Sequence, residues 1–115
     1  MNSTITTHVL DTSNGRPAEG IHATLDVLEG TDSWKTLGEG TTNKEGRIDS
    51  LLRENNAPMP GTYRLTFDVA PYFQSLGIES FFEKIPIVFR IKDPDQHYHV
   101  PLLLNPFGYS TYRGS

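Results

Sequence analysis

The feature that most constrains this fold is a series of short segments in which apolar and polar residues alternate, separated by turn-forming residues. A period of two places the apolar side chains of a β-strand on one face and the polar ones on the other. The segments with strand character are residues 3–11, 21–28, 34–42, 47–51, 62–69, 80–91, 96–104 and 109 onward. Seven or eight short strands of this kind predict an all-β protein, an antiparallel sandwich.

Turn residues and one helical segment complete the predicted fold. Residues 70–76 are expected to form a short helix, with Pro71 in its first turn and Gly77 just beyond its end. Residues 53–61 contain two prolines and two asparagines and are expected to form a loop. Gly38 and Gly40 weaken the segment 34–42 and are typical of a bulge or an edge strand.

The size and charge of the chain narrow the classes of function. A chain of 115 residues has room for one core, so we expect residues 1–115 to form a single domain. The net charge of −4, with scattered Lys and Arg, argues against binding to nucleic acid. No apolar run approaches the ~20 residues that a membrane-spanning helix needs. Without cysteine or a recognisable secretory signal, we expect a cytoplasmic protein.

The last twenty residues, 96–115, have an unusual polar character. They contain His97 and His99 and a closing Tyr-Arg-Gly-Ser, but no Asp or Glu. This composition indicates a site for an anion or a small polar ligand. On a strand, the two histidines would project to the same side. Their spacing fits metal ligation, a general-base and hydrogen-bonding pair, or two histidines with a structural role only. His8 would be the third ligand of a zinc site.

Three parts of the sequence closely resemble the transthyretin-related proteins, and more narrowly the 5-hydroxyisourate hydrolases of purine breakdown. These parts are HVLDTSNGRPAEG at residues 8–20, the Gly46-Arg47 turn, and HYHVPLLLNPFGYSTYRGS at residues 97–115. The final Tyr-Arg-Gly-Ser is the most specific of them, because transthyretin itself, the hormone-carrying branch, lacks it and has lost the histidines.

The resemblance implies a sandwich of two four-stranded sheets with one short helix. It also implies a homotetramer, a dimer of dimers, whose active sites open from a central channel. Residues Leu102, Leu103, Leu104 and Tyr109 are then expected to contribute to contacts between subunits.

The resemblance further implies hydrolysis of a cyclic amide, from 5-hydroxyisourate to 2-oxo-4-hydroxy-4-carboxy-5-ureidoimidazoline, with no cofactor and no metal. The residues expected to act in catalysis are His8, Arg47, His99 and Ser115. The residues expected to contact substrate are His8, Arg47, His97, Tyr112, Arg113 and Gly114.

Each expected role has a chemical reason. His99 would take a proton from water with His8 as its partner, or the two would exchange roles. Arg47 would hold the electron-rich ring by charge-assisted hydrogen bonds. Ser115 would donate to the ring, and its terminal carboxylate would orient a histidine. Arg113 would contact the substrate, or would instead hold the tail in place.

Two alternative functions differ from a metal-free hydrolase. One is a transthyretin-like carrier of a small aromatic ligand, without catalysis; the histidines and the Tyr-Arg-Gly-Ser end argue for the enzyme. The other is a zinc-dependent hydrolase on His8, His97 and His99, which stoichiometric metal and loss of activity to a chelator would reveal.

Overall fold

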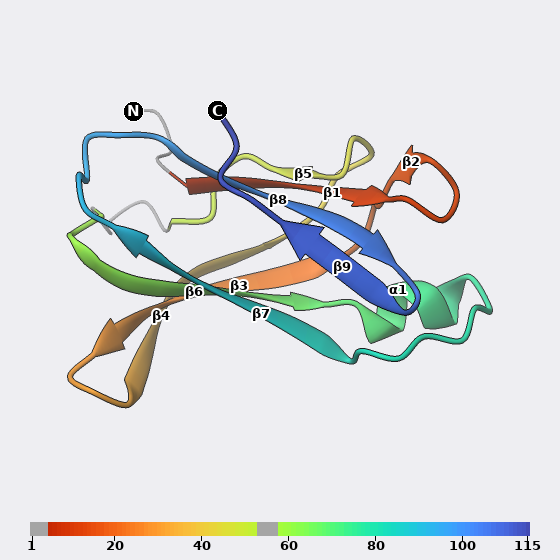
Figure 1. The fold of residues 1–115 in the computed structure, drawn as a ribbon, viewed down its shortest axis with the longest axis horizontal. Helices are drawn as coiled ribbons and strands as arrows, with labels where there is room; N and C mark the ends of the chain where they lie inside the picture. Colours follow the sequence, from red (N-terminus) through yellow and green to blue (C-terminus); the bar gives the residue numbers. More distant parts are fainter. Residues whose placement is uncertain (1–4, 53–57) are drawn as a thin grey trace.

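The computed structural model describes residues 5–52 and 58–115, which form two β-sheets and one short helix (Figure 1). The first sheet has the strand order β2-β1-β8-β9, with β5 paired to β1, and the second has the order β4-β3-β6-β7. The strands of the first sheet are β1 (Ile5–Asp11), β2 (Arg16–Pro17), β5 (Arg47–Ile48), β8 (Tyr98–Asn105) and β9 (Gly108–Thr111). Those of the second are β3 (His22–Glu29), β4 (Ser33–Thr41), β6 (Gly61–Asp68) and β7 (Lys84–Ile91).

This architecture confirms the predicted all-β sandwich with one short helix, with two corrections. First, β1 and β8 run parallel, from Ile5 opposite Tyr98 to Asp11 opposite Leu104, so the sandwich is not purely antiparallel. No hairpin joins these two strands: the whole second sheet lies between them in the sequence, and such a long crossover permits parallel pairing. Second, the first sheet has five strands, because the two-residue strands β2 and β5 both pair with β1.

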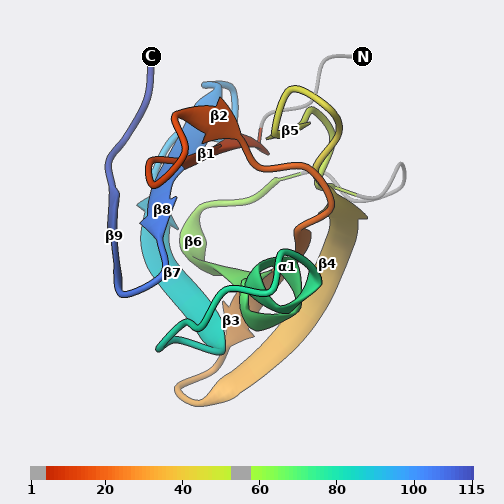
Figure 2. The ribbon, with the colours of Figure 1, turned by 90° about the vertical axis from the view of Figure 1, so that its right-hand side faces the viewer.

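The helix lies at one end of the sandwich, as the end-on view shows (Figure 2). It spans α1 (Ala70–Ser75), with proline in its first turn, close to the predicted 70–76. Its Tyr72 hydroxyl donates to Oδ2 of the buried Asp11 across 2.7 Å and so ties the helix to the end of β1. Burial and this carboxylate raise the pKa of Tyr72 to about 12. Among the described residues, no helix has the length and apolar character needed to cross a membrane.

The alternation predicted for the first strand is present. Ile5, Thr7, Val9 and Asp11 are buried, whereas Thr6 and His8 lie half-buried on the opposite face of β1. The buried apolar side chains of both sheets and of α1 form one cluster, whose largest members include Tyr63, Phe67 and Phe73. The core therefore fixes β1 so that its polar face points away from the sandwich interior.

Several predicted segments differ from the structure in extent. β7 begins at Lys84 rather than at residue 80, and β8 begins at Tyr98, so that His97 lies just before the strand.

Leu102 and Leu104 are 0% and 1% exposed and pack in the core, so the expectation that they contact other subunits is wrong. Residues 3–4 of the first predicted strand and 53–57 of the predicted loop lie outside the described residues.

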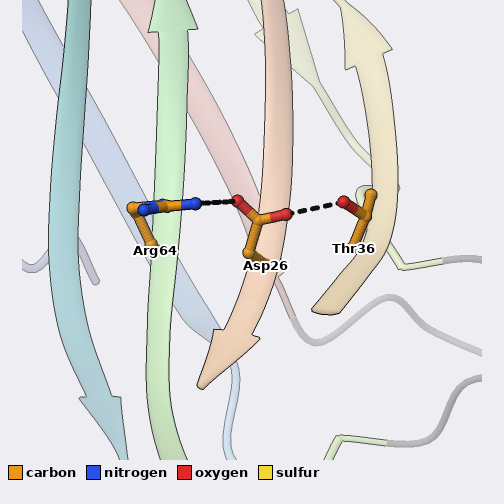
Figure 3. Close-up of polar contacts among 3 residues, drawn as sticks. All are labelled: Asp26, Thr36 and Arg64. Atoms are coloured by element: carbon orange, nitrogen blue, oxygen red, sulfur yellow. Dashed lines mark hydrogen bonds and ion pairs between the residues drawn. The ribbon is translucent and has the colours of Figure 1, made fainter. Parts of the chain in front are cut away.

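The bulge predicted near Gly38 and Gly40 is present. Polar side chains of three neighbouring strands form hydrogen bonds beside it. The register of β3 and β4 shifts between Leu25 and Asp26. Asp26 accepts hydrogen bonds from Arg64 Nη2 (2.9 Å) and from Thr36 Oγ1 (2.8 Å), as Figure 3 shows. The Arg64 guanidinium also stacks over Trp34, 4.3 Å from the ring centroid. These contacts hold the edge strand β4 to β3 and β6 where the bulge interrupts the regular pairing.

Candidate active site

An open depression of about 460 Å³ lies at one end of the first sheet. The start of β1, the strand β5, the start of β8 and the C-terminal tail converge on it; in Figure 1 the tail runs from β9 back across the sheet. The side chains and backbone that line it are those of Thr6, Arg47, Asp49, His97, His99, Tyr112, Gly114 and Ser115. Its lining combines imidazole, guanidinium, carboxylate and hydroxyl groups, which suits a small polar ligand.

The two histidines are joined by a threonine hydroxyl. The parallel register of β1 and β8 places Thr6 opposite His99. Thr6 Oγ1 lies 2.8 Å from Nδ1 of His99 and 3.1 Å from Nε2 of His97. The two imidazole rings are nearly parallel, with 6.4 Å between centroids and 16° between planes. Thr6 thus positions both rings from the neighbouring strand.

A tight turn places Arg47 beside this pair. Asn43 Oδ1 accepts from the backbone N–H groups of Glu45 (2.9 Å) and Arg47 (3.0 Å). Gly46 has φ +75°, and a Cβ there would collide with the carbonyl oxygen of Val9. Only glycine fits both conditions, because it has no Cβ and tolerates positive φ. The turn brings β5 against β1, and in their antiparallel register Arg47 lies opposite His8.

The C-terminal tail forms one side of the depression and is held by hydrogen bonds to the backbone of β8. The N–H of Gly114 donates to the carbonyl of His99 across 2.8 Å, and Thr111 Oγ1 donates to the carbonyl of Pro101 across 2.7 Å. A Cβ on Gly114 would lie 2.6 Å from Cδ2 of His99. The absence of a side chain at Gly114 therefore lets the tail rest directly on the imidazole and brings Ser115 to the depression.

Two of the residues predicted for the site are placed at its margin. Among the described residues that line the depression, neither His8 nor Arg113 is present. His8 is on the same face of β1 as Thr6, close enough to influence the charge of His99. Arg113 stacks over the ring of Tyr98, 4.6 Å from its centroid, and its Nη2 donates to Oε1 of Gln96 across 3.0 Å. This geometry favours the alternative in which Arg113 holds the tail.

The surroundings of His99 keep its imidazole neutral. Burial lowers its pKa below the ordinary value of 6.5, and the electrostatic influence of Arg47, His8 and His97 lowers it further. The carboxylate of Asp49 opposes them. At pH 7 the ring is therefore unprotonated at one nitrogen and can accept a proton.

The sequence interpretation missed Thr6 and Asp49. Thr6 shares a strand face with His8, and Asp49 follows two residues after Arg47, but neither residue type stands out without the pairing of the strands. Within residues 5–52 and 58–115, no three His, Asp or Glu side chains are grouped so as to hold a metal ion. The geometry thus gives no support to the zinc site on three histidines.

The fold and this histidine site define a transthyretin-like β-sandwich protein, and comparisons with known proteins identify its family. The model of the HIUase/Transthyretin family matches residues 5–114, so the chain belongs to this family. It is 50% identical over 115 residues to 5-hydroxyisourate hydrolase 2 of Rhizobium meliloti (strain 1021), a match that covers 96% of this chain and 95% of the relative.

Solved structures agree with this assignment. The structure of Klebsiella pneumoniae 5-hydroxyisourate hydrolase has a TM-score of 0.82 and 42% identity, and the match covers 98% of this chain and 100% of that one. Sea bream transthyretin in complex with thyroxine has a TM-score of 0.87 and 30% identity, with 96% and 94% of the two chains covered. The chain is similar in fold to both branches and closer in sequence to the hydrolase.

Proposed function

We propose that this protein hydrolyses 5-hydroxyisourate to 2-oxo-4-hydroxy-4-carboxy-5-ureidoimidazoline. The observation that carries the proposal is a neutral His99, held between Thr6 and Gly114 in a depression that Arg47 borders. The similarity to proteins named 5-hydroxyisourate hydrolase, at 42% and 50% identity, supports the same substrate. The proposal includes no cofactor, because water and acid–base groups suffice for the hydrolysis of a cyclic amide.

In the proposed reaction, His99 removes a proton from a water molecule whose oxygen bonds to the ring carbonyl carbon. The C–N bond of the ring then breaks, and the protonated imidazole returns the proton to the departing nitrogen. Water and substrate thus give the opened product with no net change in the enzyme. In the alternative assignment His8 is the base and His99 its partner; His8 lies on the same face of β1 as Thr6 and opposite Arg47 of β5.

Positive charge and hydrogen-bond donors at the rim would bind the substrate and the developing oxyanion. Arg47 is suited to holding ring oxygens, because a guanidinium forms strong, charge-assisted hydrogen bonds. Tyr112, Gly114 and Ser115 line the same depression from the tail, and His97 lines it from the residue before β8. Their expected roles are to position the ring against His99.

The assembly and location expected from the resemblance remain part of this proposal. We expect a homotetramer, and large apolar side chains on the edges of both sheets support self-association: Val88 is 59% exposed on β7 and Tyr109 41% on β9. Light scattering coupled to gel filtration measures the assembly. We expect the protein to act in the cytoplasm.

The proposal is tested with 5-hydroxyisourate generated in place by urate oxidase, following its ultraviolet band. We expect the protein to accelerate the decay, and the His99→Ala variant to lose at least about a hundredfold of this acceleration, as removal of a general base does. His22→Ala is the matched control, since His22 lies on β3 in the second sheet and pairs with Glu39 at 3.1 Å. A folded wild-type protein that leaves the spontaneous decay unchanged would refute the proposal and favour the carrier.

A further inference from the structure

The Thr6 hydroxyl has two imidazole neighbours and a single proton. A hydroxyl donates one hydrogen bond and accepts up to two. Thr6 Oγ1 lies within hydrogen-bond distance of Nδ1 of His99 (2.8 Å) and Nε2 of His97 (3.1 Å). The hydroxyl can accept from both rings, or it can accept from one ring and donate to the other. In the second arrangement the protonation of the two rings is linked.

The chemistry of His99 selects the direction of this chain. A neutral imidazole that accepts a proton at Nε2 must carry its resting proton on Nδ1. Nδ1–H of His99 then donates to Thr6 Oγ1, and the Thr6 hydroxyl donates to the unprotonated Nε2 of His97. In the reverse direction the Thr6 hydroxyl would donate to an unprotonated Nδ1 of His99. The ring proton would then be on Nε2, and that nitrogen could not act as a base.

We propose that Thr6 fixes the reactive tautomer of His99 and relays protons between His99 and His97. The inference rests on the proposed function, since it concerns the base of that reaction. Once Nε2 of His99 has taken the proton of water, its Nδ1 proton moves to Thr6 as the Thr6 proton moves to Nε2 of His97. The ring of His99 is then neutral, with its proton on Nε2, and the positive charge resides on His97.

The positions of the two rings explain why the charge would move. His97 is exposed, just before β8, whereas His99 is half-buried within it, so water solvates a charge on His97 better. At His99, Arg47 on β5, His8 on β1 and His97 disfavour the protonated form, whereas Asp49 favours it.

The second half of the reaction runs the relay backwards. Nε2–H of His99 gives its proton to the departing ring nitrogen while Thr6 returns a proton to Nδ1 and recovers its own from His97. Each residue ends in its starting state, and the net transfer is one proton from water to the ring nitrogen. The relay thus lets one imidazole serve as base and then as acid without holding a full charge in its half-buried position.

Thr6 is held firmly enough for this role. Its neighbours in β1, Ile5 and Thr7, are fully buried, and the Thr7 hydroxyl donates to the carbonyl of Val100 across 2.6 Å. Threonine is β-branched, which restricts its side chain to few rotamers. The hydroxyl of Thr6 is therefore set by the core and the strand pairing.

Thr6→Val tests the inference, because valine preserves the shape and the strand propensity but removes the hydroxyl. ¹⁵N NMR of the histidine rings without substrate reports the tautomer of His99. We expect the Nδ1–H form in the wild type and in Thr6→Ser, and a shift toward Nε2–H in Thr6→Val. Thr66→Val, on β6 in the second sheet, is the matched control and should leave the spectrum unchanged.

Turnover of 5-hydroxyisourate gives the second readout. We expect kcat to fall about ten- to a hundredfold in Thr6→Val, with KM nearly unchanged and with most of the rate restored in Thr6→Ser. An unchanged tautomer, or an altered tautomer with wild-type kcat, would overturn the relay. The spectrum needs no substrate, so it decides on the tautomer even if the wild type proves inactive on 5-hydroxyisourate, a result that would refute the proposed function separately.

Discussion

The backbone of Gly114 rests on the imidazole of His99, and a 2.8 Å hydrogen bond joins its N–H to the His99 carbonyl. The two residues form an isolated antiparallel bridge beyond the last hydrogen bonds of β9. The Tyr-Arg-Gly-Ser end is therefore not a free tail in this structure. It lines the depression together with β1, β5 and the start of β8. Its position depends on the lack of a side chain at residue 114.

Gly114→Ala is expected to impair catalysis with little effect on folding. The new Cβ would lie 2.6 Å from Cδ2 of His99, so either the ring or the tail must move. A displacement near 1 Å in an active site costs about a hundredfold in rate, and we expect a loss of that order in kcat/KM. Gly108→Ala is the control, because a Cβ there meets only the Asn105 side chain, at 3.7 Å and beyond. Wild-type kinetics in Gly114→Ala would mean that the tail does not need this contact.

The charges around His99 give a second prediction, of opposite shifts from two nearby residues. Arg47 lowers the pKa of His99 and Asp49 raises it. Arg47→Gln should therefore raise the pKa of His99, and Asp49→Asn should lower it, as followed by NMR titration of the ring. Lys44→Gln removes an exposed charge in the same turn and should have a much smaller effect. Shifts in the same direction for the first two variants would contradict the electrostatic description.

The lowered pKa of His99 also predicts how stability depends on pH. Below about pH 6.5 the unfolded chain binds a proton at this residue that the folded chain resists, because the folded pKa is the lower one. The contribution of His99 is thus present above pH 6.5 and is lost as the pH falls below it. Urea unfolding across this range should show a weaker pH dependence in His99→Gln than in the wild type. Parallel stability curves for the two proteins would contradict the prediction.

The turn before Arg47 provides a prediction with an internal control. Gly46 and Gly15 have nearly equal φ angles, +75° and +71°, but a Cβ at Gly46 would strike the Val9 carbonyl, whereas one at Gly15 has nothing within 4 Å. Gly15→Ala should cost about 1 kcal/mol of unfolding free energy for the positive φ, and Gly46→Ala clearly more. Activity should fall only in Gly46→Ala, because Arg47 would be displaced. Equal losses of stability would show that the turn yields to the added methyl group.

Local sequence patterns predicted the strands, the helix and the bulge, because each depends on a short-range period or on turn residues. They did not predict that β1 and β8 pair in parallel, since pairing across more than ninety residues leaves no trace in alternation. This pairing is what places Thr6 opposite His99. The orientation of Arg113 was also beyond reach, because the residue follows the end of β9 at Thr111, where alternation no longer assigns a face.

Arg113 leads to the last prediction, which separates substrate binding from support of the tail. Its guanidinium stacks on Tyr98 and donates to Gln96, and Tyr98 is itself fixed by hydrogen bonds between its hydroxyl and the backbone of Asp93. Loss of this stack should loosen the tail, so we expect Arg113→Ala to speed hydrogen exchange of the Gly114 amide and to lower kcat several-fold.

Arg113→Lys distinguishes the two roles. Lysine keeps the charge but not the planar group that stacks and donates in a fixed geometry, so it should behave like alanine if Arg113 supports the tail. If Arg113 instead contacts the substrate through its charge, the KM of Arg113→Lys should lie closer to the wild-type value than that of Arg113→Ala. Hydrogen exchange at Gly114 should then be normal in both variants. Because the exchange measurement needs no substrate, it reports on the tail alone, and protection equal to that of the wild type would assign Arg113 to the substrate.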